Sequence, residues 1–129
     1  MATLPWRSLG AVDREREYLA LLSFLPLRHV WSLPSFAMQS SRILAQLQHA
    51  PGLLGYSLLA RPLRKHFWTL SVWENEAALH AFVGAGAHAV TMRSLAPYMG
   101  ATRFIRWKIH GTRIPPKWAD AMDRWTTQS

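Results

Sequence analysis

His88 is the side chain of this sequence best suited to proton transfer. It follows Gly84 and Gly86, which weaken a predicted helix and favour a bend at this point. An imidazole has a reference pKa of about 6.5, so it can accept a phenolic proton near neutral pH. The structural alternative is a half-buried histidine that is hydrogen-bonded to a backbone group at the bend. We take His88 as the first catalytic candidate.

Two arginines are candidates for stabilising a negative charge. Arg103 and Arg106 are expected on opposite faces of a strand, because they are an odd number of residues apart. An inward-directed guanidinium would stabilise a phenolate or carboxylate and favour the carbanion that reacts with O₂. The alternative is a surface arginine paired with Glu74 or Asp120. We assign Arg103 a catalytic role and Arg106 a binding role.

Aromatic side chains are the expected walls of a substrate pocket. The chain has seven tryptophans in 129 residues, more than a core of this size ordinarily needs. Their rings can stack on flat polycyclic substrates, although ordinary core packing is the alternative for each one. The connector after the first strand could cover the pocket mouth or form a local hydrophobic staple. The expected substrate-binding residues are Trp31, Phe36, Trp73, Phe82, Met92, Arg106 and Trp107.

Several kinds of chemistry are excluded or not expected. The chain has no cysteine, which excludes disulfides, thiol nucleophiles and Cys-based metal sites. Its six histidines lack metal-ligand spacing, and acidic residues are too sparse for paired-carboxylate catalysis. No glycine-rich phosphate loop is present. We therefore expect neither a metal nor a cofactor.

The charge is strongly basic and unevenly spread. The net charge is +8, and no acidic residue lies between Glu17 and Glu74. The functional interpretation is an anionic partner, such as nucleic acid, acidic lipid, or a carboxylate or phenolate substrate. The alternative is a solvated, arginine-rich surface. Nucleic acid is not expected, because the third strand lacks the aromatic pattern of RNA-recognition modules.

The longest apolar run, Leu19–Leu27, is far shorter than the ~20 residues of a membrane-spanning helix. It also makes a poor signal peptide, because acidic residues precede it. We expect a cytoplasmic protein with no membrane partner.

The elements that position these residues follow from the hydrophobic pattern. Residues 1–16 are predicted to be an arm, and residues 17–129 a single domain. Strands are predicted at 18–25, 53–61, 67–73 and 102–110, and helices at 34–50, 76–83, 88–96 and 116–125. The order β-α-β-β-α-β predicts a ferredoxin-like α+β fold, with a four-stranded antiparallel sheet and both main helices on one face. All four strands are apolar on both faces, so we expect a homodimer that covers the second face and leaves a cavity between or beside the sheets.

One stretch resembles a known superfamily. Phe67–Phe82 reads FWTLSVWENEAALHAF, an aromatic strand that ends in Trp-Glu and leads into a helix carrying Ala-Leu and Phe. This resembles the dimeric α/β-barrel superfamily, which includes the antibiotic-biosynthesis monooxygenases. The continuation through His88, Met92 and Trp107 is most similar to a bacterial branch of monooxygenase-like proteins whose reactions are uncharacterised.

The resemblance implies a homodimeric α/β barrel with an apolar pocket between the sheet and the helices of each subunit. Several members oxidise polycyclic phenols with O₂ and without metal or flavin. Haem-degrading members use an Asn on strand one, a Trp in helix two and a later His. Here strand one has no Asn, Phe82 stands at the Trp position, and His88 falls too early. The haem site is therefore not carried over.

The function that follows is a cofactor-independent monooxygenase-like enzyme of secondary metabolism, acting on an aromatic or polyketide-like substrate. Its expected partners are a second copy of itself and a small apolar or aromatic ligand. The alternative is a non-catalytic dimer of the same fold that binds haem or another apolar ligand.

Overall fold

An antiparallel five-stranded sheet forms the centre of the protein in a computed structural model that describes residues 2–128. The spatial order of the strands is β1-β3-β4-β2-β5. The strands are β1 (Ala2–Ser8), β2 (Glu17–Pro26), β3 (Leu53–Arg61), β4 (His66–Trp73) and β5 (Arg103–His110). The four strands expected from the sequence are all present, and their order confirms the ferredoxin-like α+β class.

The fifth strand, β1, lies within the segment that the sequence analysis assigned to an arm. It pairs with β3 from Ala2↔Ala60 to Ser8↔Gly55, with an irregularity between Leu4 and Arg7. Pro5 falls in this irregular part, and proline is tolerated there because β1 is an edge strand. The sheet therefore has five strands rather than four.

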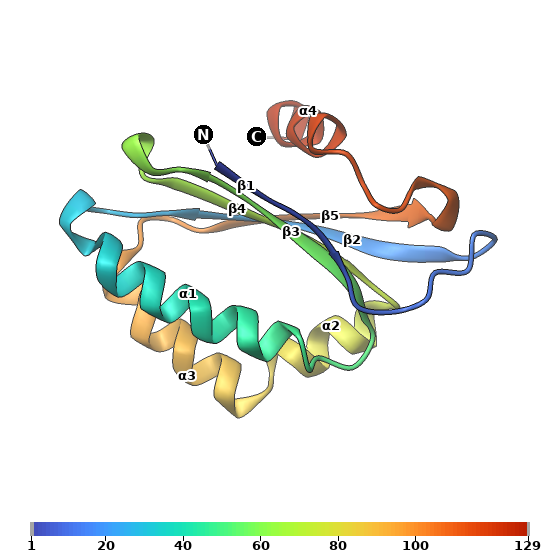
Figure 1. The fold of residues 1–129 in the computed structure, drawn as a ribbon, viewed down its shortest axis with the longest axis horizontal. Helices are drawn as coiled ribbons and strands as arrows, with labels where there is room; N and C mark the ends of the chain where they lie inside the picture. Colours follow the sequence, from blue (N-terminus) through green and yellow to red (C-terminus); the bar gives the residue numbers. More distant parts are fainter. Residues whose placement is uncertain (1, 129) are drawn as a thin grey trace.

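Three helices cover one face of the sheet, and a fourth lies over the other face (Figure 1). Those on the first face are α1 (Leu33–Leu47), α2 (Glu76–Val83) and α3 (Gly86–Leu95), and the fourth is α4 (Trp118–Gln128). The start of α2 is fixed by Asn75, whose side-chain oxygen accepts a hydrogen bond from the Ala78 amide at 2.9 Å. Within residues 2–128, none of the helices combines the length and apolar character that crossing a membrane requires.

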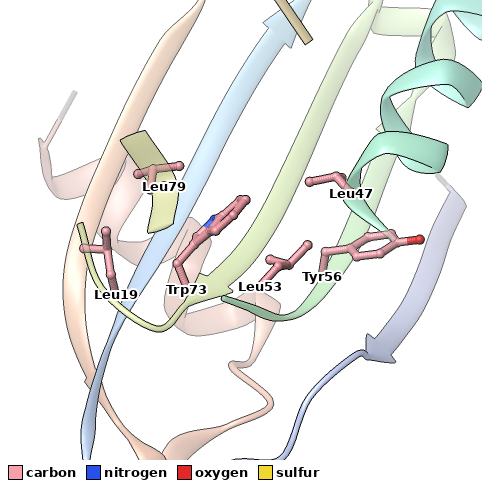
Figure 2. Packing of buried hydrophobic residues seen from close by; sticks show 6 residues of the cluster. All are labelled: Leu19, Leu47, Leu53, Tyr56, Trp73 and Leu79. Atoms are coloured by element: carbon pink, nitrogen blue, oxygen red, sulfur yellow. The ribbon is translucent and has the colours of Figure 1, made fainter. Parts of the chain in front are cut away.

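The main core lies between the sheet and the three helices. Its buried residues are Leu19, Leu47, Leu53, Tyr56, Trp73 and Leu79 (Figure 2). The Trp73 ring is only 1% exposed, and its indole N–H donates to the Ser71 hydroxyl at 2.9 Å. The polar atom of this large side chain is thus satisfied inside the core.

The second face of the sheet is partly covered by α4. Ala121 of α4 packs on Leu22 and Leu70, which are both fully buried. The α4 side chains Trp118, Met122 and Trp125 pack around them. The apolar residues on this face were the reason for predicting a second subunit from the sequence. In the structure, α4 of the same chain covers part of this face. The sheet is not closed into a barrel, and the homodimer stays a prediction.

Candidate active site

The predicted site residues lie on both sides of the sheet. His88, Phe82 and Trp73 belong to the helix-covered side, where α2 and α3 meet above the end of β4. Arg103 and Trp107 contact side chains of α4 on the other side. The structure therefore brings together one part of the expected set and separates it from the rest.

Three contacting rings, those of His88, Phe82 and Trp73, lead from the α2–α3 bend into the core. The Phe82 ring lies 4.3 Å from the His88 ring, centroid to centroid, and 5.3 Å from the Trp73 ring. Phe82 is on the last turn of α2, and His88 is on the first turn of α3. The bend at Gly84 and Ala85 turns the two helices so that these side chains meet, as the glycines in this segment predicted.

Burial sets the charge of His88. The imidazole is half-buried, and loss of hydration lowers its pKa below the ordinary 6.5. Its Nδ1 is buried and has no hydrogen-bond partner among the described residues. The sequence analysis gave a non-catalytic alternative, in which the His88 ring is hydrogen-bonded to a backbone group at the bend. The Nδ1 atom makes no such hydrogen bond. The lowered pKa favours the uncharged ring, which is the form that can accept a proton.

Polar side chains of α1 and α3 lie beside His88. The Gln46 amide group donates to the Thr91 hydroxyl at 2.9 Å and to the Ala87 carbonyl at 3.2 Å. Thr91 is three residues after His88, so both side chains lie on one face of α3. The Gln46 Oε1 atom is buried without a partner among the described residues, like His88 Nδ1. We call Gln46, Phe82, His88 and Thr91 the His88 cluster.

Gln46 and Thr91 were not among the residues expected from the sequence. The available signal was the pattern of α1, where Gln39, Ile43 and Gln46 recur at helical spacing on one face. Two glutamines in line with a partly buried isoleucine indicate a polar contact with another element. Which element makes that contact depends on how α1 and α3 pack, and the pattern does not contain that information.

Three other expected binding residues lie toward the opposite end of α1. Phe36 is 5% exposed and packs on the Phe67 ring at 4.3 Å, and Met92 packs against the same buried cluster. Trp31 is 75% exposed and stacks on the His29 ring at 4.4 Å. The connector that carries Trp31 is therefore solvent-exposed.

The two arginines point to opposite sides of the sheet, as their spacing predicted. The Arg103 guanidinium lies over the Trp125 ring of α4, 4.7 Å from its centroid. Arg106 reaches α2 and forms an ion pair with Glu76 at 2.7 Å. The ion-pair alternative for Arg106 is thus realised, with Glu76 rather than with Glu74 or Asp120.

An open cleft of about 1190 Å³ lies beside α4 on the second face. Its aromatic walls are Trp6, Trp107 and Trp118, and its rim carries Lys108, Arg113, Lys117 and Arg124 together with Asp120 and Asp123. Trp107 and Arg106 also line a smaller pocket of about 360 Å³ near Glu76. Neither of these two hollows is lined by a member of the His88 cluster.

Residues 2–128 contain no group of three or more histidine or acidic side chains placed to hold a metal ion.

Comparison with known proteins agrees with the resemblance read from the sequence. Residues 36–94 match the family model described as antibiotic biosynthesis monooxygenase. This segment runs from α1 to the end of α3 and contains the whole His88 cluster. None of the curated proteins compared with the chain matches it.

Several solved structures, two of them of oxygenases, share the fold. The crystal structure of an antibiotic biosynthesis monooxygenase superposes with a TM-score of 0.64 at 12% identity, over 69% of this chain and 95% of that one. A conserved protein from Methanosarcina mazei Go1 gives 0.64 at 10% identity, over 70% and 90%. SnoaB, a cofactor-independent oxygenase from Streptomyces nogalater, gives 0.60 at 12% identity, over 79% and 100%. The similarity to the antibiotic-biosynthesis-monooxygenase-like superfamily is confirmed.

Proposed function

We propose that this protein is a cofactor-independent monooxygenase that oxidises an aromatic or polyketide-like phenol, with His88 as the general base. The family match and the oxygenase neighbours support a monooxygenase-like protein that acts on a small molecule. The observation that carries the finer proposal is the state of His88. It is an uncharged, half-buried imidazole with an unpartnered nitrogen, and it lies inside the family-matched segment.

The reaction starts with proton transfer to His88. Removal of the phenolic proton leaves a substrate anion, and this anion is the species that reduces O₂. One oxygen atom becomes a carbonyl group on a ring carbon, which loses its hydrogen, while the phenolic C–O becomes the second carbonyl. The other oxygen atom leaves as water, which takes up that hydrogen and the phenolic proton. The four electrons that reduce O₂ come from the substrate.

The residues around His88 suit this chemistry. The Phe82 ring restricts water at one side of the imidazole and offers a face for stacking a planar substrate. The unpartnered Gln46 Oε1 can accept a hydrogen bond from a second substrate hydroxyl. Residues 83–87 at the α2–α3 bend are exposed, so the cluster lies next to a solvent-facing segment. Arg103 contacts α4 instead, and its catalytic role stays an untested prediction.

The test is O₂ consumption with anthrone and with naphthols as probe substrates. His88→Gln keeps a similar shape but removes the base, and we expect kcat to fall roughly 100-fold or more. His80→Gln is the matched control, because His80 is an exposed histidine of α2 that pairs with Glu76. We expect its activity to stay at the wild-type level. Unchanged turnover in His88→Gln would contradict the role of this residue.

The second candidate is a non-catalytic protein that binds an apolar ligand at the same cluster. The observation that favours it is that His88 is the only ionisable side chain of the cluster, so the cluster holds one base and no acid partner. Tight binding of anthrone to the wild-type protein, without O₂ uptake, would support this function over catalysis. A Soret band in the purified protein would identify haem as the ligand.

A further inference from the structure

Two turns meet at one end of the sheet. The first follows β2 and includes the short helix η1 (Val30–Ser32), and the second joins β3 to β4 through η2 (Pro62–Arg64). The Leu27 amide donates to the Lys65 carbonyl at 2.7 Å, and the Lys65 ammonium donates to the Arg28 carbonyl at 3.4 Å. Figure 1 shows both turns projecting at the same end of the molecule. We call residues 28–31 and 61–65 the basic tip.

Large apolar side chains of the basic tip face water. Leu63 is 96% exposed, Trp31 is 75% exposed and Val30 is 49% exposed. The Trp31 ring is not loosely placed, because it stacks on the His29 ring with an interplanar angle of 6°. Apolar side chains gathered on a protruding tip are unfavourable in water and indicate a surface that binds something.

The charge of the basic tip is entirely positive. It contains Arg28, Arg61, Arg64 and Lys65, and residues 18–73 include no Asp or Glu at all. Five of the seven acidic residues lie at or just beyond the other ends of β2 and β4, namely Asp13, Glu15, Glu17, Glu74 and Glu76. The eight residues of β4 separate the two ends by about 25 Å, at ~3.3 Å per residue.

We infer that the basic tip docks on the surface of an anionic lipid bilayer. Leu63 and Val30 would enter the boundary between headgroups and acyl chains, and Trp31 would lie at headgroup depth. The arginines and the lysine would contact the anionic headgroups. This inference departs from the expectation of no membrane partner. That expectation rested on the absence of a membrane-spanning segment, and peripheral docking does not require such a segment.

Two other kinds of partner fit the basic tip less well. A nucleic acid offers phosphates to the arginines but nothing that would bury the protruding Leu63 and Val30. A folded protein would need a concave surface that matches both turns, whereas a bilayer surface adapts to a protruding one. The combination of exposed aliphatic side chains with unopposed positive charge therefore favours lipid.

The test is co-sedimentation of the full chain with unilamellar vesicles, in phosphatidylcholine alone and with 30% phosphatidylserine. We expect binding to the anionic vesicles and none to the neutral ones. Arg64→Gln combined with Lys65→Asn removes two charges and should weaken partitioning by roughly fivefold for each. Asn suits position 65 because that residue has a φ of 61°.

The apolar contribution is tested by Leu63→Glu against Val90→Glu. Val90 is 54% exposed on α3, outside the basic tip, so both variants change the net charge equally. We expect Leu63→Glu to weaken binding at least tenfold and Val90→Glu less than twofold.

Three outcomes would overturn the inference. The first is no binding to anionic vesicles, and the second is an equal loss of vesicle binding in Leu63→Glu and Val90→Glu. The third is that an RNA oligonucleotide displaces the protein from the vesicles equally well whether or not Leu63→Glu is present. Vesicle binding requires no turnover, and His88→Gln should leave it unchanged. The inference therefore stands or fails independently of the proposed function.

Discussion

His88 loses part of its hydration at the bend between α2 and α3, and this loss has a consequence for stability as well as for catalysis. Its pKa is lowered in the folded protein, so the unfolded chain binds this proton more tightly. Where the unfolded state holds more protons, the free energy of unfolding rises with pH. The contribution of His88 is therefore complete above pH 6.5 and is lost as the pH falls through the lower native pKa.

We expect His88→Gln to remove this part of the pH dependence. The measurement is urea unfolding at pH 7.5 and pH 5.5 for the wild type, His88→Gln and the His80→Gln control. The loss of stability on acidification should be smaller in His88→Gln than in the other two proteins. Equal losses in all three would show that His88 does not resist protonation. In the proposed reaction the same protonation removes the base, so kcat should also decline below pH 6.5.

The loop before β2 is fixed to the end of β5 through Gly111. The Gly111 amide donates to the Arg16 carbonyl at 2.8 Å. A Cβ at position 111 would collide with the Asp13 carbonyl oxygen and lie 2.8 Å from the Arg14 Cα. Both are backbone atoms, which cannot rotate away as the end of a side chain can. Only glycine fits this contact without a shift of the loop.

We expect Gly111→Ala to lower the free energy of unfolding by about 1–3 kcal/mol, the usual cost of overpacking. Gly86→Ala is the matched control, because a Cβ there meets nothing within 4 Å and alanine favours the helix. Urea unfolding of the two variants at pH 7.5 should therefore give opposite signs. A neutral Gly111→Ala would mean that the loop moves freely away from β5.

The elements themselves were largely predictable, because most of them have strong local patterns. Strand β4 alternates clearly, α2 begins at the Asn75 cap, and Pro51 and Gly52 mark the turn shortly after α1 ends at Leu47. Strand β1 was missed because Pro5 interrupts its pattern and its partner, β3, lies about 50 residues later in the chain. Helix α4 was predicted, but its apolar stripe does not specify which face of the sheet it covers. The same limit applies to the His88 cluster, since the bend is a local feature whereas the contact with Gln46 depends on helix packing.

A second subunit would find little of the sheet left to cover. The sheet residues expected to need it, such as Leu22, Leu70 and Val72, are already fully buried in one chain. The predicted homodimer must therefore use other surfaces, such as the cleft beside α4, the free edge of β1 or β5, or a rearranged α4. We expect light scattering to give about twice the 14.7 kDa chain mass. A mass of one chain at micromolar concentration would contradict the homodimer and leave the monomer as the functional unit.

The segregation of acidic and basic residues along β2 and β4 also acts at a distance. The charge of the basic tip is unbalanced, whereas at the other end Glu74 and Glu76 pair with Arg16 and Arg106. The chain is therefore an electric dipole, and a charged boundary exerts a torque on a dipole before any contact forms. The molecule would approach a negative boundary already oriented, with the α2–α3 bend directed toward bulk water, because α1 and α3 meet there near the acidic end. This pre-alignment weakens once the Debye length falls below the size of the protein. Added salt would then lower the rate of association with the membrane by a larger factor than it raises the rate of dissociation.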